Sequence, residues 1–566
     1  MAGSWKALTN QPTFNTSTMI LLTDGRVMVQ EEGTAHWHAL TPDIKGSYIN
    51  GTWSSLKDMS FWRRYYASGV LMDGRVFLCG GEQTGDVGDT NKGEIYDPVA
   101  DTWKTIATPP WSQVGDAACC VLPNGQVMIG SISSGACIIY DPSTDSWSTT
   151  GTQGGAANTN EQTWILLPDE TILTVQCFSP YGAQKYVTSS AAWQSEGTPP
   201  VTLVDPVMSE IGPAMLMYNG KVICFGAMNS GGHGKTAIYT LPGTPTGTGT
   251  WAAGPDIPTA GGQVMVCNDC PATLLPNGKV LFTTANYASP NWGYPVEFFE
   301  YDPATNGITQ AATPSNNGTF PYGGAYPGLY WSRMMLLPSG EVLFSASSNN
   351  VQVYQPGGGP QAAWRPTVSS VARLGTIFSS SYQLQGTQLN GLSQANIYGD
   401  DCYPATNYPL VQLTNPTTND VYYCRTYNFS TMAVATGGAA QTVQFSTIGV
   451  PAGTYNLRVI ANGIPSLVFA FTLEPVSKPY FVDHGVKLEL EWYGKLVAEG
   501  DPYNWINQII DPEINALQQQ LTYLQNSVVR LNSIIQSAQL PAVGRDVAKK
   551  AKEAEEKTPS GKKRTK

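Results

Sequence analysis

The sequence is poor in charge, because Asp, Glu, Lys and Arg make up only 13% of its 566 residues. It has no apolar run of 18 or more residues, which excludes an ordinary hydrophobic membrane-spanning helix. The first thirty residues lack the basic start and the apolar stretch of a signal peptide. We therefore expect a soluble protein that is cytoplasmic or is exported without such a leader. The net charge of -11 argues against general nucleic-acid binding, since an acidic surface repels phosphate.

Histidine is also scarce, with four residues in the whole chain. His36 and His38 form an HxH pair, which would place both rings on one face of a strand. No third ligand lies near them in the sequence, so we predict no metal site there. The fingerprints of serine hydrolases, phosphate-binding loops and nucleotide-binding folds are absent.

The ten cysteines do not form a zinc-binding pattern. Cys267 and Cys270 make a single CxxC, which lacks the second pair that a structural zinc site needs. Cys402 and Cys424 fall together in a later segment. Each of these two pairs could form a disulfide, so the sequence does not decide whether the protein belongs to an oxidising or a reducing compartment. The other six lie within or beside apolar, strand-like runs, where a free cysteine behaves as a small hydrophobe: Cys79, Cys119, Cys120, Cys137, Cys177 and Cys224.

Glycine, tryptophan and tyrosine are abundant, and one hairpin pattern returns seven times. Each copy is an apolar strand, a DG, NG or SG turn that accommodates positive φ, and a second apolar strand. Only the fourth copy departs, with Asp169 and Glu170 at the turn, so we expect that turn to differ. The turn positions recur every 45 to 62 residues, as in four-stranded propeller blades: Gly25, Gly74, Gly125, Glu170, Gly220, Gly278 and Gly340.

An outer strand completes each predicted blade. It is supplied by segments such as YDPVADTW (96–103) and YDPSTDSW (140–147), whose tryptophan is expected to seal one blade against the next. The opening SWKALTNQP resembles these blade endings, so residues 5–8 are predicted to close the ring as the outermost strand of the last blade. Residues 1–365 are therefore predicted to form a seven-bladed kelch-type β-propeller in an all-β protein.

The turn repeat stops after residue 365, and alternating strands continue to about residue 475. Residues 366–475 are predicted to form an immunoglobulin-like β-sandwich, and residues 476–505 a linker. Residues 506–540 repeat apolar positions four and three apart, which predicts a coiled coil that forms a dimer or a trimer. The alternative is a helix packed on its own sandwich. The seam consists of Ile510, Ile514, Leu517, Leu521, Leu524, Val528, Leu531 and Ile535.

The last segment, residues 541–566, is polar and ends strongly basic, and it is predicted to be disordered. It is either a solvated tail or a contact for an anionic partner. Apart from this tail, we expect no nucleic-acid partner.

Residues 1–475 resemble the galactose oxidase and glyoxal oxidase family of kelch-repeat proteins and its bacterial relatives. The resemblance rests on residues 59–77 (MSFWRRYYASGVLMDGRVF), 329–344 (LYWSRMMLLPSGEVLF), 405–415 (ATNYPLVQLTN) and 421–438 (VYYCRTYNFSTMAVATGG). It implies a seven-bladed propeller that carries an immunoglobulin-like domain. The coiled coil is foreign to the family.

The resemblance also implies one copper ion held by two tyrosines and two histidines, with one tyrosine cross-linked to a cysteine. Tyr65 falls at the cross-linked tyrosine, but Thr16 is the nearest residue to the cysteine position. The axial Tyr-His pair reads Tyr330-Trp331, and the remaining histidine position reads Tyr427. Because imidazole supplies much of the affinity of such a copper site, we predict no copper and no other cofactor.

The pocket itself is predicted to persist near the propeller axis as an aromatic and arginine-lined ligand site. The alternative is that these side chains only fill the central channel. We expect a non-catalytic recognition protein for glycan or protein surfaces, displayed in several copies and suited to a larger assembly. The alternative is an oxidoreductase with a rearranged metal site. The predicted pocket residues are Arg63, Arg64, Tyr65, Tyr66, Tyr330, Trp331 and Tyr427.

Overall fold

The computed structural model describes residues 3–474 apart from 83–87, 89, 117, 156, 288–292, 315–328, 376–378 and 399–404, and the backbone of three strands between residues 480 and 500. The chain divides into two compact units, Met1–Glu474 and Pro475–Lys566. The first unit is all-β, as predicted. The helices among its described residues are two short 3-10 turns, η1 (Leu329–Trp331) and η2 (Ala362–Trp364).

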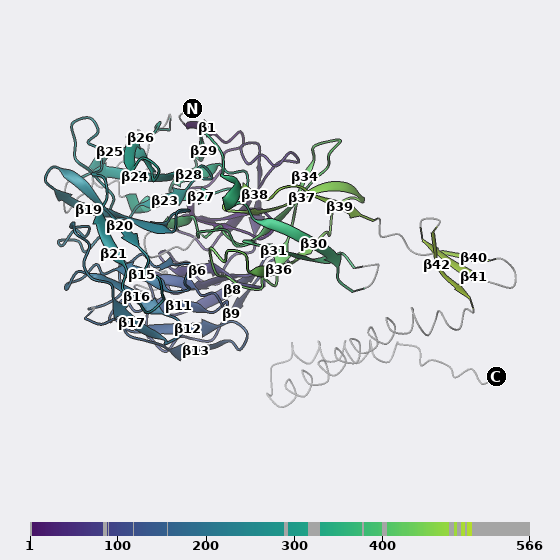
Figure 1. The fold of residues 1–566 in the computed structure, drawn as a ribbon, viewed down its shortest axis with the longest axis horizontal. Helices are drawn as coiled ribbons and strands as arrows, with labels where there is room; N and C mark the ends of the chain where they lie inside the picture. The colour runs from purple at the N-terminus through teal and green to yellow at the C-terminus, as the bar shows by residue number, and fades with distance from the viewer. Residues whose placement is uncertain are drawn as a thin grey trace, which may run out of the picture. The chain divides into compact units, whose positions relative to one another are not determined.

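Seven antiparallel sheets follow one another through residues 4–355, and each is built on four strands (Figure 1). This arrangement of four-stranded sheets is β-propeller-like. The first three sheets contain β2 (Thr16–Leu21), β3 (Val27–Glu31), β4 (Trp37–Thr41) and β5 (Thr52–Leu56); β6 (Ala67–Val70), β7 (Val76–Cys79), β8 (Gly93–Asp97) and β9 (Thr102–Thr105); and β10 (Cys119–Val121), β11 (Val127–Gly130), β12 (Cys137–Asp141) and β13 (Ser146–Thr149).

The next three sheets repeat the same order along the chain. They contain β14 (Ile165–Leu166), β15 (Ile172–Val175), β16 (Ala183–Val187) and β17 (Ala192–Ser195); β18 (Ala214–Leu216), β19 (Lys221–Ser230), β20 (His233–Thr240) and β21 (Thr250–Ala253); and β23 (Pro271–Leu274), β24 (Val280–Asn286), β25 (Gly293–Asp302) and β26 (Gly307–Gln310), with β22 (Met265–Val266) also paired to β24.

The seventh sheet joins the two ends of this region. It holds β27 (Ser332–Leu336), β28 (Val342–Ala346) and β29 (Gln352–Gln355), and its outermost strand is β1 (Ser4–Ala7). Strand β1 pairs antiparallel with β29, with Trp5 opposite Tyr354 (Figure 1). The prediction that the N-terminal segment forms the outermost strand of the last sheet is therefore confirmed. It covers an edge that would otherwise present unpaired backbone groups.

The hairpin turns have the expected left-handed glycines, with φ between 79° and 89° at all six of them. The prediction that the fourth turn differs was wrong. Glu170 adopts φ 65°, and its N–H donates to the carbonyl of Leu167 at 3.0 Å, as the N–H of Gly25 does to Leu22 in the first turn. The chain keeps the same turn with a non-glycine residue, at a strain of about 1 kcal/mol.

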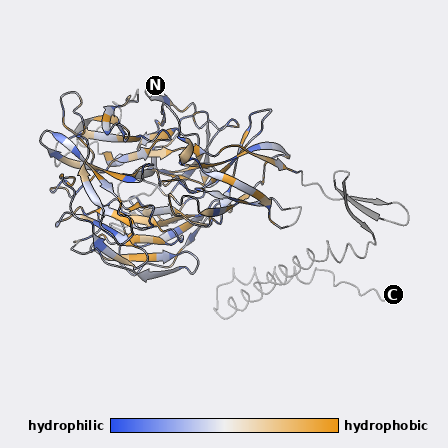
Figure 2. Cartoon of the chain, viewed as in Figure 1, coloured by the Kyte–Doolittle hydropathy of each residue, from blue (hydrophilic) through white to orange (hydrophobic). Residues whose placement is uncertain are grey.

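Burial falls from the inner to the outer strand of each sheet. Every residue of inner strands such as β2, β6 and β27 is buried, whereas the outer strands are largely exposed. Figure 2 shows the hydrophobic residues gathered on the strands. In the outer strands, tryptophan is the residue that is half-buried, as at Trp103 and Trp147.

Outer-strand tryptophans link five of the seven sheets to the sheet before them. The indole N–H groups of Trp103, Trp147 and Trp251 donate to the backbone carbonyls of Lys57, Ala107 and Glu196, each of which follows the outer strand of the preceding sheet. The two remaining bonds connect the first, sixth and seventh sheets: Trp53 to Asn10, and Trp5 to Ala312.

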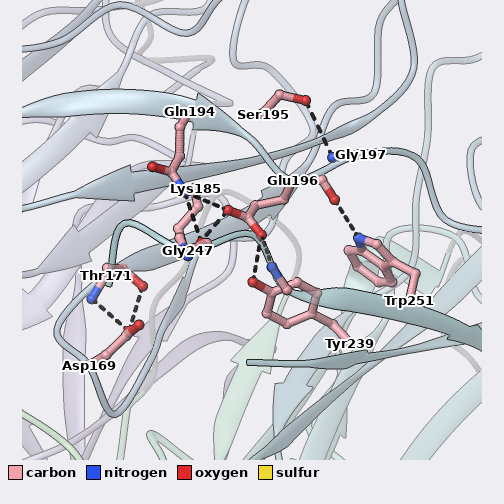
Figure 3. Close-up of polar contacts among 11 residues, drawn as sticks. Asp169, Thr171, Lys185, Gln194, Ser195, Glu196, Gly197, Tyr239, Gly247 and Trp251 are labelled. Atoms are coloured by element: carbon pink, nitrogen blue, oxygen red, sulfur yellow. Dashed lines mark hydrogen bonds and ion pairs between the residues drawn. The ribbon is translucent and has the colours of Figure 1, made fainter. Parts of the chain in front are cut away.

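A buried ion pair adds to the junction between the fourth and fifth sheets (Figure 3). The Lys185 ammonium lies 3.2 Å from the Glu196 carboxylate, and both side chains are fully buried. Lys185 also donates to the carbonyl of Gly247, and Tyr239 donates to Glu196. Burial would raise the pKa of Glu196, but hydrogen bonds from Gln194, Gly249 and Tyr239 and the charge of Lys185 hold the pKa below its usual value.

Two further sheets occupy residues 366–474. Rings from both sheets meet: Tyr382 and Phe445 of one lie 5.2 and 6.1 Å from Phe471 of the other. The first sheet has the order β30 (Thr367–Arg373), β31 (Ser381–Thr387), β36 (Ala440–Ser446) and β35 (Thr426–Tyr427); the second has β34 (Val421–Cys424), β33 (Leu410–Thr414), β37 (Gly453–Ala461) and β38 (Ile464–Pro465), with β39 (Phe469–Leu473) also paired to β37.

One strand from this region leaves it and joins the sixth sheet. Strand β32 (Asn396–Tyr398) pairs antiparallel with the inner strand β23, with Ala272 opposite Ile397. It therefore lies on the inner side of that sheet, next to a strand with no exposed residue. This insertion could not be predicted from the sequence, because the two strands that pair lie more than 120 residues apart in the chain.

The second unit has a three-stranded antiparallel sheet of β40 (Tyr480–Asp483), β41 (Leu488–Trp492) and β42 (Lys495–Gly500). This differs from the linker predicted for residues 476–505. The alternation of Leu488, Leu490 and Trp492 with two glutamates is a strand pattern that the sequence analysis overlooked. The predicted coiled coil and basic tail lie outside the described residues. Within the described part of the chain, no helix is long and apolar enough to cross a membrane.

Candidate functional site

The hairpin turns of the propeller-like sheets are covered by the C-terminal segment of the first unit. The N–H of Thr426 donates to the carbonyl of Thr23 at 3.0 Å, and the N–H of Met432 donates to Pro123 at 2.9 Å. Tyr408 donates its hydroxyl to the carbonyl of Leu21. A ligand site on the open side must therefore be sought at the opposite ends of the inner strands, where those strands begin.

The residues at these strand starts share one place in the repeat, nine positions before the turn residue. The N–H of Asp116 donates to the carbonyl of Tyr65 at 3.2 Å, and the N–H of Asp269 donates to Ile211 at 2.9 Å. These bonds join equivalent positions of neighbouring sheets, so the positions form one rim, which we call the axial mouth. Its members are Thr16, Tyr65, Asp116, Glu161, Ile211, Asp269 and Trp331.

Half-buried aromatic rings cluster at the axial mouth. The rings of Tyr65 and Tyr330 lie edge to face with their centroids 6.5 Å apart, and Tyr330 and Trp331 lie 5.0 Å apart. Tyr65 comes just before β6, and the other two come just before β27, so the cluster joins the second and seventh sheets. Such rings, each with a polar group, suit stacking on the face of a sugar.

Arg64 lies among these rings and is not a free cation. Its guanidinium carbon is 5.0 Å from the centroid of Trp331 and 5.4 Å from that of Trp62. It also pairs with Glu32, with Nη2 and Oε1 2.5 Å apart. The ion pair neutralises the charge and fixes the guanidinium between the two indoles, so Arg64 contributes a flat, stacked surface.

Two predicted pocket residues, Arg63 and Tyr66, are buried in the fold and do not face a ligand. The Arg63 side chain is 0% exposed and pairs with the equally buried carboxylate of Glu94. Tyr66 is buried and donates to the side chain of Gln30 at 2.7 Å, and Gln30 in turn donates to the carbonyl of Arg63 at 2.9 Å. These residues hold the segment that carries Arg64 and Tyr65.

The prediction for Tyr427 also needs correction. Tyr427 lies in β35, next to the Thr426 backbone that binds the first hairpin turn, and its hydroxyl donates to Ser381 at 3.0 Å. Its ring lies 4.8 Å from the Arg425 guanidinium. Tyr427 therefore belongs to the covered side and not to the axial mouth. The strand that reaches the inner side of a propeller-like sheet is β32.

Carboxylates at the axial mouth were missed by the sequence analysis. Asp116, Glu161 and Asp269 occupy the same repeat position as Tyr65, and all four have positive φ, between 41° and 59°. Counting nine residues back from each turn would have found them. This recurring left-handed backbone turns the chain into each inner strand at some cost in strain.

The charge around Tyr330 comes from several sheets. Burial raises the pKa of Tyr330, and a hydrogen bond with Trp331 lowers it. The carboxylates of Asp269 and Glu210 raise the pKa further, and Arg64 lowers it. The phenol therefore stays protonated and offers its O–H as a hydrogen-bond donor at neutral pH.

The donor set at the axial mouth does not fit the copper ion that the family resemblance implies. Thr16 is fully buried and donates its hydroxyl to the carbonyl of Ser348 at 2.8 Å. Tyr330 has an indole beside it where the family has an imidazole, and Tyr427 lies elsewhere. The described residues include no group of three or more His, Cys, Asp and Glu side chains arranged for a metal.

The two histidines of the HxH pair bind two different carboxylates. His36 pairs with Asp58 at 3.0 Å, and His38 pairs with Glu31 at 3.1 Å. The hydrogen bond with Asp58 raises the pKa of His36. Each imidazole therefore has a carboxylate partner of its own.

A cleft with a volume of about 590 Å³ lies on the covered side instead of at the axial mouth. It is lined by residues that include Asp73, Arg75, Asp141 and Phe429. Its charged groups are already engaged: Arg75 pairs with Asp73 at 2.7 Å, and Gln126 donates to Asp141 at 3.1 Å. We therefore place the candidate site at the half-buried rings of the axial mouth and not in this cleft.

Comparisons with known proteins agree with the repeat. Residues 63–110, which include the second sheet, match the kelch motif. An 83-residue stretch is 34% identical to galactose oxidase of Gibberella zeae, covering 15% of this chain and 11% of the relative. The chain therefore contains a kelch motif and is similar to galactose oxidase over this stretch. The match spans about a ninth of the length of its curated relatives.

Two solved structures match a larger share of the chain. A fungal alcohol oxidase in complex with copper matches with a TM-score of 0.47 and 13% identity, over 84% of this chain and 99% of that one. A streptogramin B lyase matches with a TM-score of 0.43 and 12% identity, over 63% of this chain and 99% of that one.

Proposed function

We propose that this galactose oxidase-like chain is a non-catalytic recognition protein. Its binding head is a seven-bladed kelch propeller with an immunoglobulin-like sandwich, and a C-terminal coiled coil displays that head in several copies. The ligand is a glycan that stacks on the rings of the axial mouth. Joining weak contacts through a common stalk raises the effective concentration of each head and so strengthens binding.

Seven blades are supported by the sheets and by their links. In five sheets, a tryptophan of the outer strand donates a hydrogen bond to the preceding sheet. The Trp5 bond joins the seventh sheet to the sixth, and the Trp53 bond joins the first sheet to the seventh. The inner strand β27 contacts both β2 and β23. A chain of sheets whose last member contacts the first suits a closed ring.

An immunoglobulin-like sandwich for residues 366–475 is supported by the two antiparallel sheets and by the rings that meet between them. Tyr382 and Phe471 pack edge to face across the sheets. The sheets alternate buried and half-buried residues, as in β36 and β37, which is typical of strands with one face in a core.

The observation that carries the recognition function is the ring cluster of Tyr65, Tyr330 and Trp331 beside the neutralised Arg64. The neighbouring planar groups in this cluster lie 5.0 to 6.5 Å apart, and each of the four is half-buried. Rings that only filled a channel would be expected to be fully buried, as Trp37 and Trp164 are. Sugar faces bind such surfaces through C–H contacts and through hydrogen bonds to the phenol and indole groups.

The rival function is an oxidoreductase that uses the same mouth with a rearranged metal site. We expect the full-length protein, incubated with Cu(II) and desalted, to retain far less than one copper per chain and to release no peroxide from alcohols or aldehydes, because no imidazole lies at the mouth positions. Elemental analysis and a peroxide assay measure both quantities. One copper per chain together with peroxide release would overturn the recognition function.

The coiled coil predicted for residues 506–540 gives a separate expectation for the assembly state. By light scattering, the full chain should have two or three times the mass of one chain, whereas a chain ending near Pro475 should be a monomer. Replacing Leu517 and Leu524 with aspartate tests the same seam, because buried charge abolishes knob packing. If the full chain and the shortened chain are both monomers, the coiled coil does not form.

A further inference from the structure

In the turn that leads into β23, the thiols of Cys267 and Cys270 share one hydrogen-bond acceptor. Cys267 and Cys270 lie on either side of Asn268 and Asp269, and all four precede the inner strand of the sixth sheet. Both sulfurs lie close to the carbonyl oxygen of Thr283, Cys267 at 3.4 Å and Cys270 at 3.2 Å. The two sulfurs can therefore be no farther apart than the sum of these two distances.

The two thiols interact directly as well. Burial raises the pKa of the Cys267 thiol well above its usual value, and its hydrogen bond with Cys270 raises the pKa further. Other described cysteines turn to acceptors of their own: Cys119 to the carbonyl of Ser68, and Cys177 to that of Glu161. All nine described cysteines are free thiols in the structure, and Cys402 lies outside the described residues.

We propose that Cys267 and Cys270 are joined by a disulfide in the mature protein. The oxidant is a small-molecule disulfide of the glutathione type. One thiolate attacks that disulfide and releases one small thiol, and the second thiolate then attacks the mixed disulfide and releases the other. The protein loses two protons and two electrons, and the small disulfide takes them up to become two thiols.

Burial determines when the bond forms. Both cysteines are 0% exposed in the folded chain, and the raised pKa of Cys267 leaves little of the reactive thiolate, so the buried pair reacts slowly. The exchange therefore takes place during folding, before β22 and β23 pair with β24 around the turn. The same burial protects the finished bond from reducing agents, which gives it the character of a structural disulfide.

The cross-link fixes a carboxylate of the axial mouth. It closes the loop that holds Asp269, whose φ is 41° and whose charge acts on Tyr330. The ends of the loop are already tied to the fifth sheet, through Cys267 N–H to Gly226 and Asp269 N–H to Ile211, both at 2.9 Å. A disulfide would hold this left-handed turn without further contacts, whatever ligand the mouth binds.

Peptide mapping tests the proposal on the full chain. The protein is refolded with oxidised and reduced glutathione, denatured, alkylated without reduction, and digested. We expect the peptide that contains residues 267–270 to be unalkylated and two mass units lighter than its reduced form, while the peptides of Cys79, Cys137 and Cys224 are alkylated. Alkylation of both Cys267 and Cys270 after this refolding would overturn the proposal.

Thermal melting gives a second readout with a matched control. Closing a four-residue loop is expected to raise the Tm of a domain of this size by about 2 °C. The oxidised wild type should therefore melt about 2 °C above the Cys270→Ser variant, whereas Cys224→Ser should leave the oxidised-minus-reduced difference in Tm intact. An equal Tm for oxidised and reduced wild type would contradict the cross-link, and the mass measurement decides the question even if Cys270→Ser does not fold.

Discussion

Replacing Arg63 with methionine should lower the free energy of unfolding by about 3–5 kcal/mol, because the change leaves the fully buried Glu94 carboxylate without its partner. The same guanidinium donates to the carbonyls of Gly80 and Lys92, which would lose these bonds as well. Denaturant unfolding followed by tryptophan fluorescence measures the loss. The segment that carries Arg64 and Tyr65 should loosen with it.

The matched control is Arg75→Met, which removes an arginine from a surface pair with Asp73. This pair is about one-third exposed, so its loss should cost less than about 1 kcal/mol. The double variant Arg63→Met, Glu94→Leu should recover a large part of the stability, since it leaves no buried charge unpaired. Equal losses for Arg63→Met and Arg75→Met would contradict the structural role given to Arg63.

Deleting residues 3–10 should lower the Tm of the first unit by about 5 °C, because it removes the strand that completes the seventh sheet. Trp5 packs against Phe298 of the sixth sheet at 5.0 Å and against Phe344 of the seventh at 5.5 Å. The deletion would expose these rings and the edge of β29 together. Differential scanning calorimetry measures the change.

Trp5→Ala serves as the companion variant for this deletion. It keeps the backbone pairing of β1 with β29 and removes only the ring contacts and the bond from the indole to Ala312. Its Tm should lie between those of the wild type and the truncated chain. A truncated chain that melts like the wild type would refute the closure by the N-terminal strand.

The repeat made much of the fold predictable. Each turn motif required a hairpin, and the structure has those hairpins with left-handed glycines at Gly25, Gly74 and the other turns. The tryptophan of the outer strand was expected to seal neighbouring sheets, and Trp103 and Trp147 do so. These features depend on local chemistry that repeats along the chain, and for that reason a single sequence shows them.

The candidate site was predictable only in part. Tyr65, Tyr330, Trp331 and Arg64 come together, because each lies beside the start of an inner strand, at a position fixed by the repeat. Arg63 and Tyr66 point into the fold, where they bind Glu94 and Gln30. The sequence does not show these partners, because they lie in other strands.

Features that depend on contacts between distant segments escaped the sequence analysis. Tyr427 was placed at the axis by motif alone, but the backbone bond of Thr426 to Thr23 holds it on the covered side. The pairing of β32 with β23 joins segments more than 120 residues apart.

The central claim is that the axial mouth recognises glycans through its aromatic rings. The most direct measurement is a glycan array probed with the full-length protein, with Trp331→Ala, and with Tyr181→Ala, which removes an exposed ring outside the mouth. We predict that the wild type and Tyr181→Ala bind the same glycans, and that Trp331→Ala loses at least about tenfold in affinity. Equal binding by all three proteins, or no binding by the wild type, would contradict the claim.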